Sequence, residues 1–194
     1  MFFLIIVIVV ALIVIISGGK LENLKYCSFK CSWLVLIAVT LKIISISNLY
    51  QVVGLSHNII PYLRVLSLLM VVLFVGFNYS LRGVPLVGLG LICNALVIIL
   101  NGGNMPINAK FAHLTSTGDE LKLLESGLPV NSFVLTSPDT KLAILSDIFL
   151  MPEWVPMTRL FSIGDVLITI GAIIFVTYYL KYHNYPVSKK YFNY

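Results

Sequence analysis

The sequence predicts an all-α integral membrane protein with about five transmembrane helices, and three observations support this class. Of the 194 residues, 59% are hydrophobic and only 11% are charged, whereas soluble domains carry about a quarter charged residues. The apolar residues form long uninterrupted blocks, and transmembrane strands would need alternating polar residues instead. The net charge of +5 comes from Lys and Arg residues scattered singly between the blocks, which is typical of a topology signal.

The first apolar block covers residues 2–16 and ends at Ser17 and two glycines. A secretory signal peptide has a basic amino-terminal region and a small-residue cleavage site. This block has no basic side chain before it and no Ala-x-Ala after it. It therefore predicts a retained membrane helix.

Four further blocks predict the remaining transmembrane helices. Each approaches the ~20 residues that cross ~30 Å of hydrocarbon at ~1.5 Å per residue, and in lipid a helix satisfies its own backbone hydrogen bonds. The first of the four is the weakest prediction because it contains Lys42, Ser45 and Asn48. The four blocks cover residues of about 33–50, 62–77, 84–100 and 161–180.

Basic residues predict the orientation of the chain. They gather in the first and third connections and in the tail, whereas the second connection, residues 51–61, has none. Because excess Lys and Arg marks the cytoplasmic side, we expect the amino terminus outside and the carboxyl terminus in the cytoplasm, in a bacterial plasma membrane. Residues 101–160 then lie outside, and residues 161–194 form the last helix and a cytoplasmic tail. The basic residues are Lys20, Lys25, Lys30, Arg82, Lys181, Lys189 and Lys190.

Residues 101–160 predict an extracytoplasmic, partly helical segment that lies at the membrane interface and packs over the mouth of the bundle. A short helix is expected over 117–125 and an extended stretch over 128–136. The Ser-Pro-Asp sequence at 137–139 is typical of a helix start, so a second surface helix is expected over 137–151.

Two carboxylates are the candidate catalytic residues. Asp147 lies near the end of the second surface helix and Asp165 one turn into the last membrane helix, so both are expected at the outer boundary of the bilayer. Two adjacent carboxylates do not both ionise easily, and such a pair can supply an acid and a base at neutral pH. The alternative is that Asp165 caps the last helix and Asp147 is merely solvated.

The sequence around these aspartates resembles the carboxyl-terminal part of lipoprotein signal peptidases. The resemblance lies in residues 145–149 (LSDIF) and 161–168 (FSIGDVLI) and covers about residues 143–176. It implies an intramembrane aspartyl hydrolase with Asp147 and Asp165 as its dyad. The chain departs from that family at Ser162, where the family has Asn, and at Gly164, where it has Ala.

A second resemblance covers more of the chain. Residues 101–106 (NGGNMP), His113, the expected helix over 140–147 and the FSIGD sequence at 161–165 resemble a family of bacterial polytopic membrane proteins that is known as a domain of unknown function. The resemblance implies that residues 101–165 form one unit. It implies no mechanism.

The NGGNMP sequence supplies two candidate ligand-binding residues, Asn101 and Asn104. Its two glycines permit backbone torsions that are closed to other residues, and free amides there are able to meet a carboxylate or a phosphate headgroup. The alternative is that Gly102 ends the fourth helix and Pro106 prevents its continuation.

Four other polar residues are further ligand-binding candidates, namely His113, Ser162, Lys42 and Arg64. His113 also fits a hydrogen-bonded structural role. Lys42 is expected either to point into the bundle toward a partner such as Asp165 or to reach the interface. Arg64 fits either a headgroup anchor or a counter-ion for Asp165.

Other sites are not indicated. No dense basic run with interleaved aromatics predicts a nucleic-acid partner, and no motif for a nucleotide, a metal or a nucleophilic serine occurs. Cys27, Cys31 and Cys93 form neither a disulfide framework nor a metal set. We therefore expect no cofactor and no metal.

Three functions remain open. The first is a non-catalytic component that binds another membrane protein, or a second copy of itself, through the outer segment. The second is the aspartyl membrane hydrolase. The third is a carrier of a small solute or ion with Lys42 and Asn94 along its path, although five helices without an internal repeat are not typical of a transporter.

Overall fold

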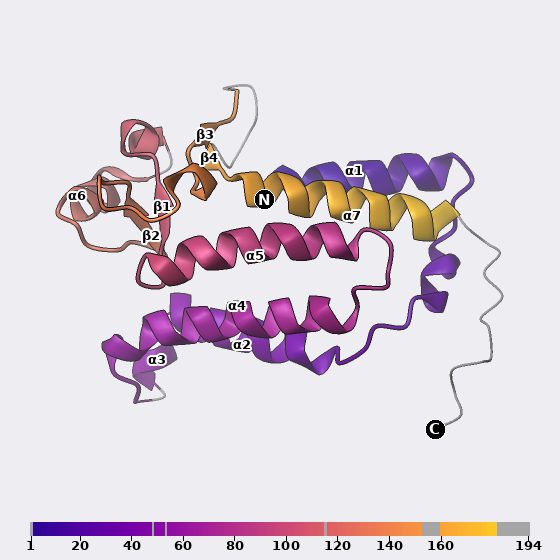
Figure 1. Ribbon diagram of the computed structural model, residues 1–194, viewed down its shortest axis with the longest axis horizontal. Helices are drawn as coiled ribbons and strands as arrows, with labels where there is room; N and C mark the ends of the chain where they lie inside the picture. Colours follow the sequence, from indigo (N-terminus) through magenta and orange to yellow (C-terminus); the bar gives the residue numbers. More distant parts are fainter. Residues whose placement is uncertain (1, 48, 53, 115, 153–159, 182–194) are drawn as a thin grey trace.

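The computed structural model describes residues 2–181 except 48, 53, 115 and 153–159. The predicted tail lysines, Lys189 and Lys190, and Asn48 therefore lie outside the described residues. Five apolar helices dominate the described part (Figure 1). They are α1 (Phe2–Ile16), α2 (Trp33–Ile46), α4 (Ile60–Phe77), α5 (Val84–Leu100) and α7 (Ile163–Lys181).

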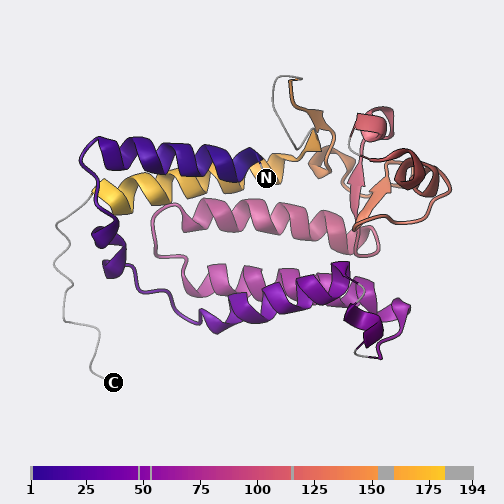
Figure 2. The ribbon, with the colours of Figure 1, turned by 180° about the vertical axis from the view of Figure 1, so that it is seen from behind.

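Two of these helices, α4 and α7, are long and apolar enough to cross a membrane, while α1, α2 and α5 are shorter apolar helices. The five pack as a row in the order α2, α4, α5, α7, α1 (Figures 1 and 2). Neighbours run in opposite directions except α7 and α1, which run side by side in the same direction. One short connection joins α4 to α5, whereas α5 and α7 are joined by residues 101–160, which we name the outer segment. Residues 101–160 therefore emerge from the middle of the row.

Glycines bring α5 and α7 into close contact. A Cβ at Gly90 would lie 2.8 Å from the Ile168 side chain, and one at Gly171 would lie 2.7 Å from the carbonyl oxygen of Gly83. Small residues of this kind let two helix backbones approach closely. The α5–α7 pair is thus the tightest part of the row, and it carries the outer segment.

The second helix is shorter than expected. The prediction extended it to about residue 50, but α2 ends at Ile46 and a separate short helix, α3 (Leu49–Val52), follows. The Ser45 hydroxyl donates to the Lys42 carbonyl oxygen at 2.8 Å, and the Ser47 hydroxyl donates to that of Ile43 at 2.6 Å. Serine side chains that bond the preceding turn in this way compete with the backbone and favour the end of a helix.

The first residues of the third and fifth apolar helices also differ slightly from the prediction. A turn, η2 (His57–Ile59), leads directly into α4, which starts at Ile60 with Pro61 in its first turn. Proline suits that position because its missing N–H has no helical partner there. The last helix starts at Ile163 because Leu160 and Phe161 form a strand, β4.

One end of the bundle carries the basic connections. The short helix η1 (Leu21–Tyr26) follows α1, and the Lys20 amide donates to the Leu180 carbonyl oxygen at 2.9 Å. The Asn78 side chain, after α4, accepts from the Lys30 amide and donates to its carbonyl oxygen. The Arg82 guanidinium lies 4.3 Å from the centre of the Tyr178 ring. These contacts gather basic residues from the first and third connections at the end opposite the outer segment (Figure 1).

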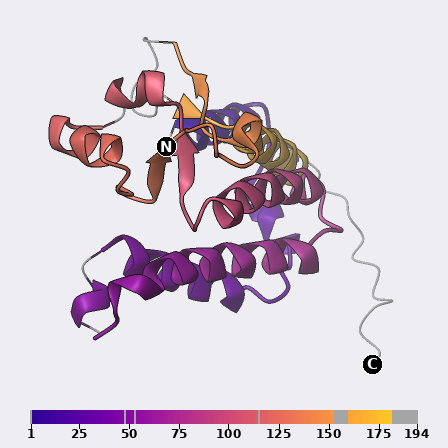
Figure 3. The same cartoon turned by 60° about the vertical axis from the view of Figure 1, so that its left-hand side comes forward.

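The outer segment forms a small unit beside the ends of α5 and α7 (Figure 3). In it, β1 (Met105–Ile107) pairs in parallel with β2 (Phe133–Leu135), and β3 (Phe149–Leu150) pairs antiparallel with β4. Between β1 and β2 lie η3 (Ala109–Leu114) and α6 (Gly118–Glu125). The buried core of this outer unit contains Ile107, Ala112, Leu124 and Leu160.

The first predicted surface helix is confirmed as α6. A capping box starts it, in which the Glu120 carboxylate accepts from the Thr117 amide at 2.9 Å. These bonds lower the pKa of Glu120, first through the Thr117 backbone and then through the Thr117 side chain. The prediction succeeds here because the capping bonds and the helix both lie within residues 117–125 and depend on no distant part of the chain.

The second predicted surface helix, over 137–151, is wrong. Only a short turn, η4 (Ala143–Leu145), is helical, and Leu142 before it adopts a left-handed conformation with φ 52°. The Asp147 amide donates to the Pro106 carbonyl oxygen at 3.0 Å, and its carbonyl oxygen accepts from the Asn108 amide at 3.1 Å. Asp147 thus pairs with the free edge of β1, and this non-local pairing overrides the local helix-start signal.

Candidate functional site

The candidate site lies where the outer unit meets the bundle. Asp147 lies in the segment that pairs with the edge of β1. Ser162 and Asp165 lie at the start of α7, and Asn94 lies in α5. Ser162 is fully buried, and the other three side chains are partly buried. Hydrogen bonds connect all four residues, so the structure brings both predicted aspartates into one network.

Asp165 caps the helix in which it lies. The Ser162 amide donates to Asp165 Oδ2 at 3.2 Å, and the Asp165 amide donates to the Ser162 hydroxyl oxygen at 3.1 Å. The Asn94 amide group donates to Asp165 Oδ1 at 3.0 Å. Both carboxylate oxygens therefore have donors, and the reciprocal bonds with Ser162 form a capping box in which Asp165 replaces the usual Glu or Gln. The helix-cap alternative for Asp165 agrees with this geometry.

Ser162 connects the two aspartates. Its hydroxyl donates to Asn94 Oδ1 at 3.0 Å, and its side chain is also hydrogen-bonded to the Asp147 carboxyl. A hydroxyl has one proton to donate and two lone pairs that accept. Because the bond to Asp147 lowers the pKa of that carboxyl, Ser162 donates in it, and its single proton has two alternative acceptors, Asn94 Oδ1 and the Asp147 carboxylate.

Asp147 is not a merely solvated carboxylate. Burial, and after it the nearby Asp165 charge, raise the pKa of Asp147 to about 7, against the lowering effect of the Ser162 hydrogen bond. The cause is that a partly buried carboxylate beside a second one is costly to ionise. Near neutral pH, Asp147 is therefore present in both its protonated and its ionised form.

Gly164 allows Asn94 to reach this network. A Cβ at Gly164 would overlap with the Asn94 side-chain oxygen. Close packing of α5 against α7 places the Asn94 amide beside the first turn of α7. The Gly at this position, where signal peptidases have Ala, is thus matched to an Asn on the neighbouring helix.

Comparison with known proteins identifies the family. The sequence profile of a family of unknown function, DUF5317, matches residues 26–177, which is more than half of the chain. The chain belongs to this family. An uncharacterised protein of Thermotoga maritima is 26% identical over 170 residues, which cover 87% of this chain and 86% of that protein. No solved structure matches the chain.

The DUF5317 match covers all four residues of the network and the whole outer unit, and it begins after α1. The expectation of a family of unknown function is confirmed. Neither match is described as a signal peptidase, so that resemblance stays a prediction for this DUF5317 chain.

Two candidate residues of the NGGNMP sequence hold neighbouring segments. Asn101 Nδ2 donates to the Lys141 carbonyl oxygen at 2.9 Å, and Asn101 Oδ1 accepts from the Lys141 amide at 3.0 Å. Asn104 accepts a hydrogen bond from the Arg64 guanidinium and donates to the Gly102 carbonyl oxygen. Gly102 has a positive φ after α5, in agreement with the helix-end interpretation.

The basic candidates do not meet the aspartates. The described partner of Arg64 is Asn104, and Asp165 is bonded to Asn94 and Ser162, so Arg64 is not the counter-ion of Asp165 in this structure. Lys42 is more than a third exposed, and it lies close enough to Arg64 on the neighbouring α4 for their positive charges to repel.

Lys42 and Asn94 do not share a path through the bundle. Lys42 belongs to α2 and Asn94 to α5, and α4 lies between these helices in the row. The two residues predicted to line the path of a carrier are therefore on separate helix interfaces.

His113 and the cysteines lie apart from the network. His113 is exposed on η3, and none of the hydrogen bonds described at Asp147 or Asp165 involves it. Burial raises the pKa of Cys27 to about 11, so its thiol is protonated and poorly nucleophilic at neutral pH. Across the described residues, no group of three or more His, Cys, Asp or Glu side chains is placed to hold a metal ion.

Sequence reasoning did not place Asn94 with the two aspartates and named it only as part of the path of a solute carrier. The available signal is an amide in the middle of an apolar helix, where an unpaired polar group is costly and a partner on a neighbouring helix is expected. The paired glycines of α5 and α7 would have identified that neighbour.

Proposed function

We propose that this DUF5317 protein is a multi-pass protein of the bacterial plasma membrane with five crossings, whose outer unit binds another membrane protein without catalysing a reaction. The outward faces of the five helices support the membrane placement. Large apolar side chains are exposed on every helix, among them Leu12 (53%), Leu36 (70%), Leu73 (49%), Leu96 (46%) and Ile174 (42%). Apolar surface of this extent is typical of contact with lipid or with a partner.

The short helices are compatible with five crossings. The shortest, α2, has 14 residues and spans ~21 Å at ~1.5 Å per residue, compared with ~30 Å of hydrocarbon. Local thinning of the bilayer and snorkelling of flanking side chains accommodate such a mismatch at a modest cost. The gathering of Lys30, Arg82 and Lys181 at one end supports a cytoplasmic position for that end and an outside position for the outer unit.

The turn at residues 141–145 carries the partner proposal. It presents Leu142 (41% exposed) and Ile144 (66% exposed) at the surface of the outer unit. Leu142 is in the left-handed region, which costs ~1–2 kcal/mol for a residue other than glycine. Asn101 holds the turn in place through its two bonds to Lys141. A strained backbone at Leu142 beside exposed apolar side chains is typical of a binding site.

Site-specific photocrosslinking tests the partner proposal. A photoreactive residue at position 144 is expected to capture one protein of defined mass in intact membranes. The matched control is position 128, where Leu128 is an exposed apolar residue (54%) of the same unit, in the connection between α6 and β2. Asn101→Ala is expected to weaken the adduct because it releases the turn. Lipid adducts alone, or the same adducts from both positions, would reject the proposal.

The aspartyl hydrolase is a second candidate, favoured by the raised pKa of Asp147 beside Asp165. In this proposal, one carboxyl is protonated and the other is ionised at neutral pH, and together they activate a water against a peptide carbonyl. The bonds that occupy both Asp165 oxygens make this candidate second rather than first.

A lipid-modified peptide substrate separates the two candidates. The hydrolase proposal requires cleavage that is lost in Asp147→Asn and in Asp165→Asn. Asp139→Asn, an exposed aspartate of the same unit, is the control and should cleave normally. Because Asp165 also caps α7, the folded state of its variant is verified by circular dichroism. No cleavage by the wild-type protein would leave the binding proposal alone.

A further inference from the structure

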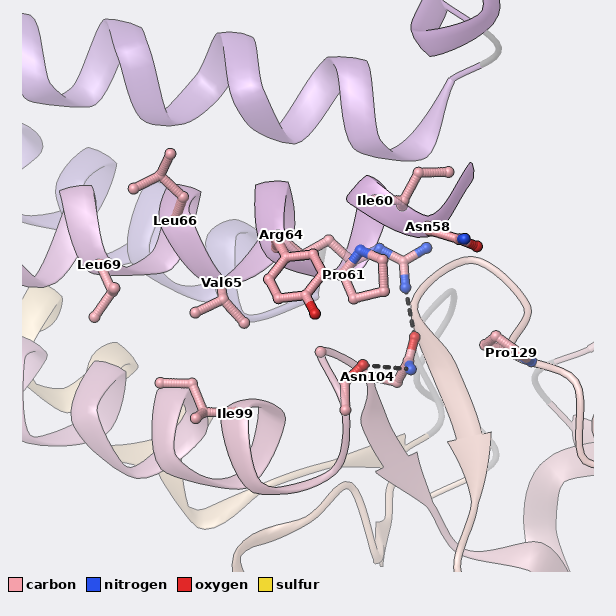
Figure 4. A pocket seen from close by; sticks show the side chains of 13 residues that line it. Asn58, Ile60, Pro61, Arg64, Val65, Leu66, Leu69, Ile99, Asn104 and Pro129 are labelled. Carbon is pink, nitrogen blue, oxygen red and sulfur yellow. Dashed lines mark hydrogen bonds between the residues drawn. The ribbon is translucent and has the colours of Figure 1, made fainter. Parts of the chain in front are cut away.

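A cavity of about 920 Å³ lies between α4, α5 and the start of the outer unit (Figure 4). Val65, Leu69 and Ile99 point toward one another across the gap between the two helices. At its outer end stand Arg64 and Asn104. The cavity thus has one long apolar part and one short polar part that carries a positive charge.

The charge in this cavity is incompletely satisfied. Arg64 Nε is buried and has no hydrogen-bond partner among the described residues, and the guanidinium donates to the neutral side chain of Asn104. The neighbouring charge is positive, because Lys42 lies close enough to Arg64 to repel it. The one ion pair found within the described ranges, between Lys122 and Asp119, is elsewhere. A partly buried cation of this kind is stabilised by an anion that accepts two hydrogen bonds.

The backbone around the cavity fixes the position of the polar end. A Cβ at Gly103 would lie 2.8 Å from the Cβ of Pro61, so only glycine lets the turn after α5 approach the start of α4 this closely. Asn104 is in turn held by its bond to the Gly102 carbonyl oxygen at 3.1 Å. The acceptor that faces the Arg64 guanidinium, Asn104 Oδ1, is therefore preorganised (Figure 4).

The depth of Arg64 matches a lipid headgroup. Arg64 is the fifth residue of α4, so it lies ~6 Å from the outer end of the helix at ~1.5 Å per residue. Leu69 is five residues further along, ~7.5 Å deeper by the same rise. In the proposed membrane placement, the guanidinium is at the level of lipid phosphates and the apolar part of the cavity is at the level of acyl chains.

We infer that this cavity binds one anionic phospholipid, with its phosphate on the Arg64 guanidinium and an acyl chain between Leu69 and Ile99. Arginine suits a phosphate because its planar donors form two parallel bonds to it. The negative charge of the lipid complements the Arg64–Lys42 pair, and a zwitterionic lipid leaves that repulsion uncompensated. The inference rests on the proposed placement of α4 in the membrane, but it needs no partner protein and no catalysis.

Lipid titration of the purified full-length protein in a neutral detergent tests the inference. Phosphatidylglycerol is expected to bind about tenfold more tightly than phosphatidylcholine, a difference of ~1.4 kcal/mol. Both lipids offer the same phosphate to Arg64, but the choline cation of phosphatidylcholine is repelled by the positive charges of Arg64 and Lys42. Native mass spectrometry is expected to find one retained phosphatidylglycerol per chain. Arg64→Gln should abolish the preference between the two lipids. Arg82→Gln, at the opposite end of the bundle, is the matched control and should leave it unchanged.

A second variant separates a lipid from a free anion and from a folding defect. Ile99→Trp retains Arg64 and fills the apolar part, so it should weaken phosphatidylglycerol binding about tenfold or more. An excess of inorganic phosphate should not displace the lipid. Equal binding of both lipids by the wild-type protein, a preference that survives Arg64→Gln in a folded protein, or displacement by inorganic phosphate would each overturn the inference. If Arg64→Gln does not fold, unchanged binding by Ile99→Trp overturns it.

Discussion

At the scale of single residues, Asp147 is the side chain whose environment differs most from what its sequence neighbours indicate. Its carboxyl is partly buried beside Asp165, and its backbone belongs to the edge of β1. Local sequence identified the residue and the partner aspartate, because both are acidic groups at the border of an apolar region. The burial that raises the pKa of Asp147 depends on the whole outer unit and has no local signal.

The raised pKa of Asp147 predicts a pH-dependent stability. Between the ordinary aspartate value of 3.8 and about 7, the folded state retains a proton that the unfolded state has lost. The free energy of unfolding therefore falls as the pH rises through this window and is level above it. Asp147→Asn stays neutral and should lack this fall, so it should be more stable than the wild type at pH 8. The scale of the effect is ~1.4 kcal/mol per pKa unit.

Thermal unfolding in detergent between pH 4 and pH 8 measures this effect. Asp139→Asn, which removes an exposed aspartate, is expected to follow the wild-type curve. If the stability of the wild type and that of Asp147→Asn changed with pH in the same way, the pKa of Asp147 would be the same in the folded and the unfolded protein. That result would contradict the burial of Asp147 beside Asp165.

Gly164 provides a second prediction at this scale. Gly164→Ala should destabilise the protein by ~1–3 kcal/mol, because the added Cβ overlaps with the Asn94 side chain and overpacks the α5–α7 contact. Gly76→Ala is the control: nothing lies within 4 Å of its Cβ position on α4, and alanine favours the helix by ~0.5–1 kcal/mol. Equal effects of the two changes on the melting temperature would contradict the close approach of α5 and α7.

At the scale of elements, the apolar helices were predictable and the outer unit was predictable only in part. The helices follow from runs of apolar residues, and α6 follows from a cap and a periodic pattern within one short segment. The prediction of a helix over 137–151 is wrong because backbone groups of this segment bond distant parts of the chain: Asp147 bonds the edge of β1, some forty residues earlier, and Phe149–Leu150 pairs with β4. Strand pairing between distant segments leaves little trace in the local sequence.

Asn78 gives a prediction for the contact between the end of α4 and the segment before α2. Its buried side chain makes two bonds with Lys30 and a third with the Phe74 carbonyl oxygen. Asn78→Ala leaves the Lys30 amide and carbonyl groups unpaired, which should cost ~1–3 kcal/mol. Asn58→Ala, at an exposed asparagine in the opposite connection, should change the free energy of unfolding by less than ~0.5 kcal/mol. Chemical unfolding in detergent compares the two, and equal losses would contradict a specific role for Asn78.

At the scale of the whole molecule, the row of helices places all the described basic connections at one end and the outer unit at the other (Figures 1 and 2). The sequence predicted this separation through the alternation of basic and non-basic loops. The sequence did not predict the order of the helices in the row. Glycines on α5 and α7 set that order through close contacts, and in the sequence they look like any other glycine in an apolar run. The network of Asn94, Ser162, Asp147 and Asp165 is a consequence of that order.

The central claim is that the outer unit and the basic end lie on opposite sides of a membrane, and cysteine labelling in intact cells tests it most directly. In a chain with Cys27, Cys31 and Cys93 replaced by serine, single cysteines are introduced at Asp119, on exposed α6, and at Ser80, in the exposed connection before α5. A membrane-impermeant maleimide should label Asp119→Cys in intact cells and Ser80→Cys only after the cells are broken. Labelling of both positions, or of Ser80→Cys alone, in intact cells would contradict the account.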